Sequence, residues 1–109
     1  MDNPEISVLF ADIVSFTEMS EKISSEKIVG FLNDMFSQFD DLTERYGVEK
    51  IKTIGDSYMV VSGMPVQRED HALTLFNLAK EMIKISAQFK DHNGNPIKLR
   101  IGINSGPAI

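Results

Sequence analysis

Two aspartates that lie far apart in the sequence are the residues best suited to chemistry. Asp12 follows residues 5–10, a segment rich in β-branched and aromatic side chains, and Asp56 lies in the turn-like stretch Gly55-Asp56-Ser57. Paired carboxylates bind hard divalent cations such as Mg²⁺ or Mn²⁺, and the lack of cysteine and of a histidine cluster argues against softer metals. The alternative at this point is that Asp12 caps a helix and Asp56 fills a hairpin turn.

Two further features are suited to binding phosphate. The sequence after Asp12 contains a helix start at Ser15-Phe16-Thr17, and the free N–H groups of a helix start can receive phosphate oxygens. Arg100 lies in an alternating segment near the C-terminus, and arginine can hold phosphate through two parallel hydrogen bonds. The alternatives are a simple capping turn and a solvent-exposed strand arginine.

The hydrophobic pattern predicts the elements that must position these residues. Strands are predicted over residues 5–10, 48–54, 58–62 and 97–103, and residues 15–25 carry helix-cap signals. Apolar residues recur at three- and four-residue steps from Ile28 to Tyr46, which predicts one face of a long helix ended by Gly47. Gly63-Met64-Pro65 is expected to end the hairpin. A second helix is predicted over residues 69–89, with its buried side formed by Ala72, Leu75, Phe76, Ala79, Met82, Ile83 and Phe89.

The order β-α-β-β-α-β predicts an α+β fold with a ferredoxin-like core, in which both helices cover one face of an antiparallel sheet. Right-handed crossovers place the first and third strands in the centre, with the fourth beside the first and the second beside the third. The end of the first strand then lies beside the start of the third. We therefore expect Asp12 and Asp56 to meet at one edge of the sheet, with Arg100 nearby.

Composition limits the classes of partner. The chain has 109 residues, which is one domain at most, and a formal net charge of −5. An acidic chain is a poor match for a nucleic-acid backbone, so RNA binding, which uses the same order of elements, is disfavoured. No apolar run is long enough to span a bilayer, no secretory signal is recognisable at the start, and the absence of cysteine fits a cytoplasmic location.

Three ordered motifs resemble the catalytic domains of class III adenylate/guanylate cyclases. They are residues 10–17 (FADIVSFT), 52–59 (KTIGDSYM) and 100–107 (RIGINSGP), and residues 63–65 and 69–72 also look like the family's segment before its second core helix. The resemblance implies cyclisation of a nucleoside triphosphate to its 3′,5′-monophosphate with release of pyrophosphate. It covers almost the whole chain, so residues 1–109 are interpreted as a cyclase catalytic domain used in intracellular signal transduction.

The resemblance also implies roles for individual residues. Asp12 and Asp56, with the backbone carbonyl of Ile13, would hold two Mg²⁺ or Mn²⁺ ions. Backbone groups of Phe16 and Thr17 would hold the terminal phosphates, and Arg100 would neutralise them. Lys52 and Ile54 would contact the base. Because lysine only donates hydrogen bonds, it suits adenine N1 and would not pair with the N1–H of guanine, so ATP is the expected substrate.

The same resemblance implies a homodimer formed through the open sheet face, with each active site shared between two subunits. Family domains continue beyond the position matching Ile109, so we expect a domain truncated at its C-terminal side, with little activity as it stands. An upstream sensor domain is expected in the full protein. The alternatives are a guanylate cyclase and a non-catalytic nucleotide-binding or regulatory domain.

Overall fold

The fold is built from three helices and four strands in the part of the chain described by the computed structural model, residues 5–64 and 67–107. In chain order they are β1 (Glu5–Ile13), α1 (Phe16–Lys22), α2 (Ser25–Tyr46), β2 (Glu49–Ile54), β3 (Ser57–Ser62), α3 (His71–Ser86) and β4 (Leu99–Pro107). The strands form one antiparallel sheet in the order β2-β3-β1-β4. This order confirms the predicted topology and the α+β fold class.

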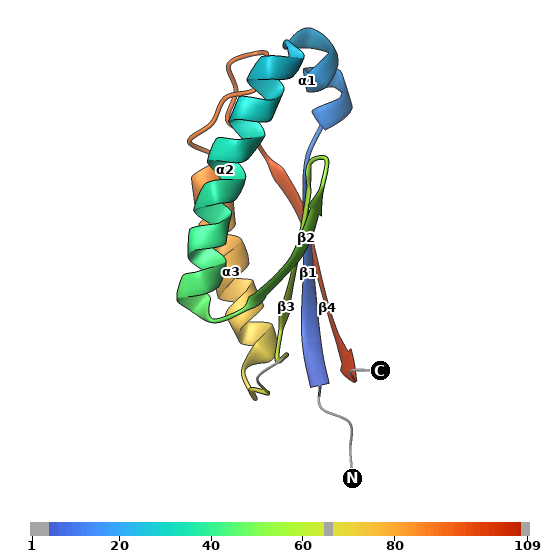
Figure 1. Ribbon diagram of the computed structural model, residues 1–109, viewed down its shortest axis with the longest axis vertical. Helices are drawn as coiled ribbons and strands as arrows, with labels where there is room; N and C mark the ends of the chain where they lie inside the picture. Colours follow the sequence, from blue (N-terminus) through green and yellow to red (C-terminus); the bar gives the residue numbers. More distant parts are fainter. Residues whose placement is uncertain (1–4, 65–66, 108–109) are drawn as a thin grey trace.

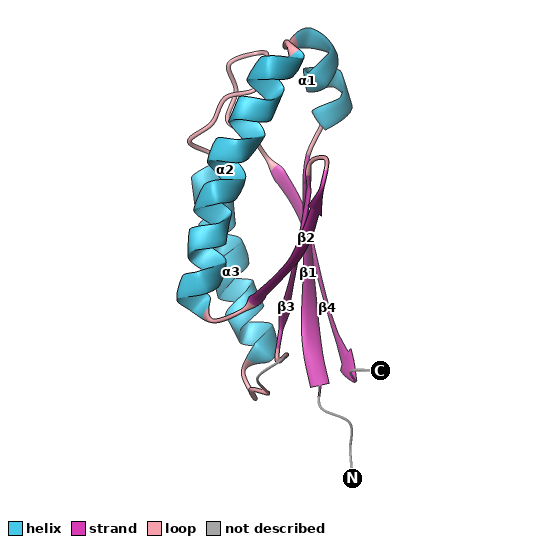
Figure 2. Ribbon diagram, viewed as in Figure 1, coloured by secondary structure: helices cyan, strands magenta, loops and turns pink. Residues whose placement is uncertain are grey.

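Helices α2 and α3 lie side by side against one face of the sheet, and the opposite face is open (Figures 1 and 2). The short helix α1 lies beyond the end of the sheet where β1 ends and where β2 turns into β3 (Figure 1). No helix in the described residues is both long enough and apolar enough to cross a membrane.

Alternation along β1 divides the sheet into a covered and an open face. Ser7, Leu9, Ala11 and Ile13 are buried beneath the helices, whereas Ile6, Val8, Phe10 and Asp12 are more accessible. Phe10 keeps 44% of its surface exposed, although it lies in the middle of the central strand. Because successive side chains of a strand point to opposite faces, the open face is apolar in the middle and carries Asp12 at one end.

Local sequence determines where α2 begins and ends. The side chain of Ser24 accepts a hydrogen bond from the Lys27 amide at 3.3 Å, and Gly47 ends the helix in the left-handed conformation at φ 68°. The predicted apolar stripe is confirmed, since its members are buried or pack against the core: Ile28, Leu32, Met35, Phe36, Phe39, Leu42 and Tyr46.

The predicted buried side of α3 was wrong in part. Ala72, Phe76 and Ile83 are exposed, and the helix instead buries His71, Thr74, Leu75, Leu78, Ala79, Met82 and Ser86. Large apolar residues occur on both sides of this helix, so periodicity alone does not identify the side that packs.

Several predicted boundaries also differ from those of the structure. Strand β1 runs on through Asp12, α3 is shorter than residues 69–89, and β4 begins at Leu99 and continues to Pro107. The cap signals in residues 15–25 form a separate helix, α1, ahead of α2. Ile97 is buried but precedes β4. Gly63 adopts φ 97° directly after β3, as expected of a residue that ends the hairpin. Pro65 lies outside the described residues.

Candidate active site

One cavity brings together most of the residues proposed from the sequence. It has a volume of about 300 Å³ and lies at the end of the sheet near α1. Its lining comprises Asp12, Ile13, Ser15, Phe16, Thr17, Asp56 and Arg100. The antiparallel pairing of β1 with both β3 and β4 produces this convergence, because it places the end of β1 beside the start of each neighbouring strand.

The two aspartates have different surroundings. Asp12 lies opposite Arg100 in the β1–β4 ladder, and Oδ1 of Asp12 lies 3.9 Å from Nη1 of Arg100. This oxygen is buried and has no hydrogen-bond partner. Asp56 is held in place, because its Oδ2 accepts a hydrogen bond of 3.0 Å from the backbone N–H of Ile13.

These donors fit a divalent metal ion. A buried carboxylate oxygen without a partner is costly, and a cation between Asp12 and Asp56 would satisfy it. The described residues contain no cluster of three or more His, Cys, Asp and Glu side chains placed to hold a metal. An ion here would therefore depend on the two carboxylates, a backbone carbonyl such as that of Ile13, and oxygens from a ligand.

Ser15 also lines this cavity, and its backbone conformation is not signalled by the sequence. It adopts the left-handed conformation at φ 60°, and it is the only residue other than glycine with positive φ in the described chain. Its side chain makes no capping hydrogen bond to α1, although its carbonyl accepts from Met19 at 3.1 Å. This turn joins β1 to α1, and Phe16 and Thr17 at the start of α1 line the cavity.

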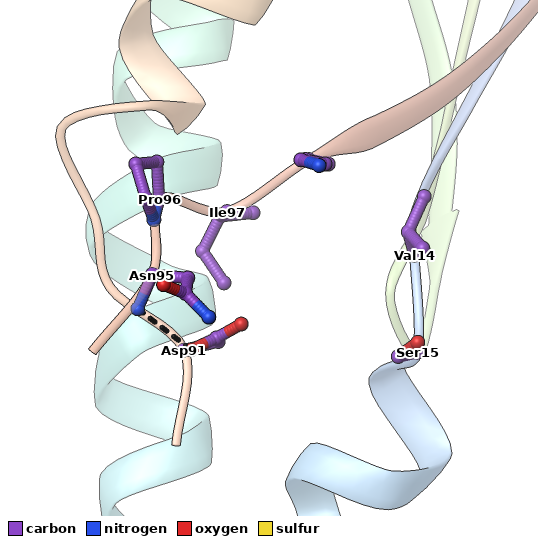
Figure 3. A pocket seen from close by; sticks show the side chains of 7 residues that line it. Val14, Ser15, Asp91, Asn95, Pro96 and Ile97 are labelled. Carbon is purple, nitrogen blue, oxygen red and sulfur yellow. Dashed lines mark hydrogen bonds between the residues drawn. The ribbon is translucent and has the colours of Figure 1, made fainter. Parts of the chain in front are cut away.

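Ser15 also lines a second cavity, of about 340 Å³, between the β1–α1 turn and the loop before β4 (Figure 3). Asp91 on the far wall accepts hydrogen bonds from the backbone N–H groups of Asn93 and Asn95, at 2.8 and 2.9 Å. These two bonds hold the pKa of Asp91 below its usual value. The Asp91 carboxylate thus stabilises the conformation of its own loop.

Lys52 and Ile54, the residues expected to contact a base, do not line the first cavity. Both lie on the edge strand β2, where Lys52 is opposite Met59 and Ile54 is opposite Ser57. Both are exposed, Ile54 to 64%. Met59 is also the partner of Phe10, so Lys52 belongs to the open face of the sheet.

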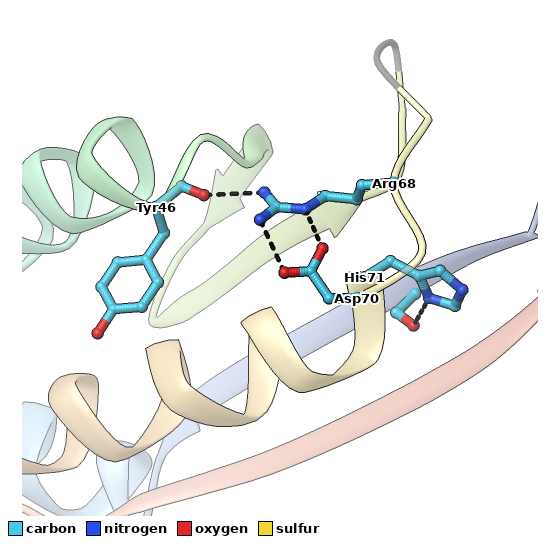
Figure 4. Close-up of polar contacts among 5 residues, drawn as sticks. Tyr46, Arg68, Asp70 and His71 are labelled. Atoms are coloured by element: carbon cyan, nitrogen blue, oxygen red, sulfur yellow. Dashed lines mark hydrogen bonds and ion pairs between the residues drawn. The ribbon is translucent and has the colours of Figure 1, made fainter.

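Polar contacts at the start of α3 were not anticipated from the sequence (Figure 4). Arg68 pairs with Asp70 at 2.8 Å and donates to the carbonyl of Tyr46 at 3.1 Å, so it links the approach to α3 with the end of α2. The ring of His71 shares a buried hydrogen bond of 2.6 Å with Ser7 in β1. The Arg68–Asp70 pair is local, but the contacts of Arg68 with Tyr46 and of His71 with Ser7 join residues far apart in sequence, so no local pattern signals them.

The ferredoxin-like sheet thus places two carboxylates, an arginine and a backbone turn around one cavity. Residues 2–109 match the family model described as the adenylate and guanylate cyclase catalytic domain. The chain belongs to this family, which confirms the resemblance seen in its motifs.

Comparison with known proteins agrees with this family. The chain is 50% identical over 105 residues to a protein named adenylate cyclase from Mycobacterium tuberculosis (strain ATCC 25618 / H37Rv). The matched region covers 96% of this chain and 24% of that protein. It resembles the catalytic core of a rhodopsin–guanylyl cyclase with converted specificity, in complex with ATPαS (TM-score 0.88, 38% identity, 98% of this chain and 58% of that one). It also resembles a guanylyl cyclase domain from the aquatic fungus Blastocladiella emersonii that is described as a non-canonical dimer (TM-score 0.86, 38% identity, covering 95% of this chain and 58% of that one). The chain therefore spans about a quarter of the adenylate cyclase and under two thirds of the solved domains.

Proposed function

We propose that this chain forms the metal- and phosphate-binding part of an adenylate cyclase that converts ATP to 3′,5′-cyclic AMP and pyrophosphate. The observation that carries the proposal is the convergence of Asp12, Asp56 and Arg100 on one cavity beside the β1–α1 turn. The similarity to an adenylate cyclase over 96% of the chain supports the same function. We also propose that the domain acts in the cytoplasm and is attached to a membrane or sensor segment outside this chain.

Each residue of the cavity has a role in this proposal. Asp12 and Asp56, together with the carbonyl of Ile13, would hold two Mg²⁺ or Mn²⁺ ions. Bound metal would lower the pKa of the ribose 3′-hydroxyl and stabilise charge at the α-phosphorus. The backbone N–H groups of Phe16 and Thr17 orient the terminal phosphates. Arg100, beside Asp12, neutralises charge on the departing pyrophosphate.

Base recognition is assigned to the open face of β2. Lys52 donates to adenine N1, and Ile54 provides an apolar contact for the ring. The ammonium group has no acceptor for the N1–H of guanine, which favours ATP over GTP.

The open sheet face is proposed to form a homodimer. Ile6, Val8 and Phe10 make this face apolar at its centre, and exposed apolar patches usually mark interfaces. In such a dimer Lys52 of one subunit would face the aspartates of the other.

Metal binding tests the assignment of the two aspartates directly. We expect Mn²⁺ to bind more tightly in the presence of a non-hydrolysable ATP analogue, as measured by calorimetry. Asp12→Ala and Asp56→Ala should each abolish this binding while circular dichroism shows a folded chain. Asp34→Ala, at an exposed acid on α2, is the matched control and should bind normally. Unchanged titrations in both site variants would refute the proposed metal site.

Base preference is tested by Lys52→Glu. The substitution removes a donor and adds repulsion toward adenine N1, so affinity for the Mn²⁺–ATP analogue should fall about tenfold, the equivalent of one lost hydrogen bond. Lys84→Glu, on α3, makes the same charge change away from the site and should have no effect. A wild-type affinity in Lys52→Glu would contradict the role of Lys52, and a preference of the wild-type chain for the GTP analogue would favour a guanylate cyclase.

A further inference from the structure

Strand β2 contains a β-bulge that changes which of its residues lie on the open face of the sheet. Glu49 and Lys50 are opposite Val61 and Val60, whereas Lys52, Thr53 and Ile54 are opposite Met59, Tyr58 and Ser57. Ile51 therefore has no partner of its own in β3. A bulge inserts one extra residue into a strand, so it reverses the alternation of faces along the strand.

As a result, Lys50 and Lys52 lie on opposite faces although they are two residues apart. Lys50 is opposite Val60, which is buried beneath the helices, and Lys52 is opposite Met59 of the open face. The two-residue turn at Gly55-Asp56 sets the second half of β2. A regular continuation of that half would pair Ile51 with Val60 and would move Lys50 to the open face beside Lys52.

Contacts with α2 hold Lys50 on the covered side. Its Nζ lies 3.0 Å from Oδ1 of Asp40 and 5.4 Å from the centre of the Tyr58 ring. The hydroxyl of Tyr58 donates to the same Asp40 carboxylate at 2.6 Å. Asp40 thus joins α2 to two neighbouring strands, β2 through Lys50 and β3 through Tyr58.

The bulged register has an evident cost. Ile51 keeps 44% of its surface exposed, whereas in the regular register it would lie toward the helices in the place that Lys50 now occupies. Burial of an isoleucine is favourable, so the bulge requires compensation from elsewhere. The Asp40–Lys50 ion pair and the contact of Lys50 with the Tyr58 ring supply it.

We propose that Asp40 is a positioning residue that selects the bulged register of β2 and so keeps Lys50 off the open face. Lys52 is then the one lysine of β2 presented there, and the base meets a single ammonium group from this strand. Loss of the Asp40 charge lets the first half of β2 slip by one residue, which buries Ile51 and brings Lys50 beside Lys52. The consequence for the base rests on the function proposed above, but the register itself does not.

Nuclear magnetic resonance of this chain without nucleotide measures the register. In the wild-type chain we expect cross-strand nuclear Overhauser effects between Lys50 and Val60. Asp40→Asn keeps an acceptor for the Tyr58 hydroxyl but removes the charge, and it should replace these signals by signals between Lys50 and Val61. Asp41→Asn, on the exposed side of α2, is the control and should retain the wild-type pattern.

Two more variants keep the test decisive. Lys50→Glu places a second carboxylate beside Asp40 and should cause the same slip, so it serves if Asp40→Asn does not fold. Adding Ile51→Thr to Asp40→Asn removes the gain from burying Ile51 and should restore the wild-type register. Persistence of the residue 50–Val60 signals in folded Asp40→Asn or Lys50→Glu overturns the proposal.

Nucleotide binding separates this proposal from the proposed function. A slipped register adds an ammonium group beside Lys52, and we expect the ratio of affinities for the ATP and GTP analogues to change at least threefold in Asp40→Asn. A slipped register with an unchanged ratio would confirm the positioning by Asp40 and count against the base-reading role of Lys52.

Discussion

Replacing Tyr58 by phenylalanine removes one hydroxyl from the core and leaves the ring. The ring is fully buried and packs against Phe36 and Phe39, with centroids 5.3 and 5.4 Å away, and phenylalanine can keep both contacts. The variant therefore isolates the hydrogen bond of 2.6 Å from Tyr58 to the Asp40 carboxylate.

The size of the effect follows from the charge and exposure of the acceptor. Hydrogen bonds to charged groups contribute about 1.5–3 kcal/mol to stability. The side chain of Asp40 is 47% exposed and keeps its ion pair with Lys50, so water can replace part of the lost bond. We therefore expect a loss of about 1.5 kcal/mol, which corresponds to a decrease in Tm of roughly 6–12 °C for a domain of this size.

The dependence on pH gives an independent check. Burial, and next the hydrogen bond to Asp40, raise the pKa of Tyr58 well above its ordinary value of 10.0. The hydroxyl thus contributes its full stability below pH 10, and this contribution is lost as the pH rises further because the unfolded chain ionises first. The difference in free energy of unfolding between the wild-type chain and Tyr58→Phe should therefore become smaller above pH 10.

Urea unfolding followed by circular dichroism at pH 7 and at pH 11 measures both quantities. Tyr46→Phe, at the partly buried tyrosine near the end of α2, is the matched control for the removal of one phenolic hydroxyl. Equal stability of Tyr58→Phe and the wild-type chain at pH 7 would refute the reasoning, as would a difference that does not change with pH.

Three further changes test other parts of the fold. Gly63→Ala should lower the free energy of unfolding, measured in urea, by about 2 kcal/mol, because φ is 97° and the new Cβ would lie 2.9 Å from the carbonyl oxygen of Glu5. Gly94→Ala, at a glycine that also has positive φ but no neighbouring atom in the way, should lower it by less. Asp91→Ala should lower Tm at pH 7, but by less below about pH 4, because the depressed pKa of Asp91 stabilises the fold only while the carboxylate is charged. Phe10→Ser should weaken self-association in sedimentation, whereas Phe76→Ser on α3 should not.

Much of the fold follows from patterns that short stretches of sequence contain. Alternation in β1, the stripe of α2 and its end at Gly47 depend on neighbouring residues, so the order of elements and the sheet topology were predictable. The candidate site was also largely predictable, because antiparallel pairing of β1 with β3 and β4 brings Asp12, Asp56 and Arg100 together.

Tertiary contacts alone decided the remaining features. The packed side of α3 could not be predicted from its sequence, because the helix carries apolar residues on several sides. Its contacts with the sheet and with α2 determine which of these residues are buried. The left-handed turn at Ser15 and the bond from the Ile13 amide to Asp56 arise where strand ends meet. The face presented by Lys50 depends on a bulge supported by Asp40, ten residues earlier on another element. The sequence by itself determined which residues could reach the site, and contacts between distant segments determined how those residues are held and which way they face.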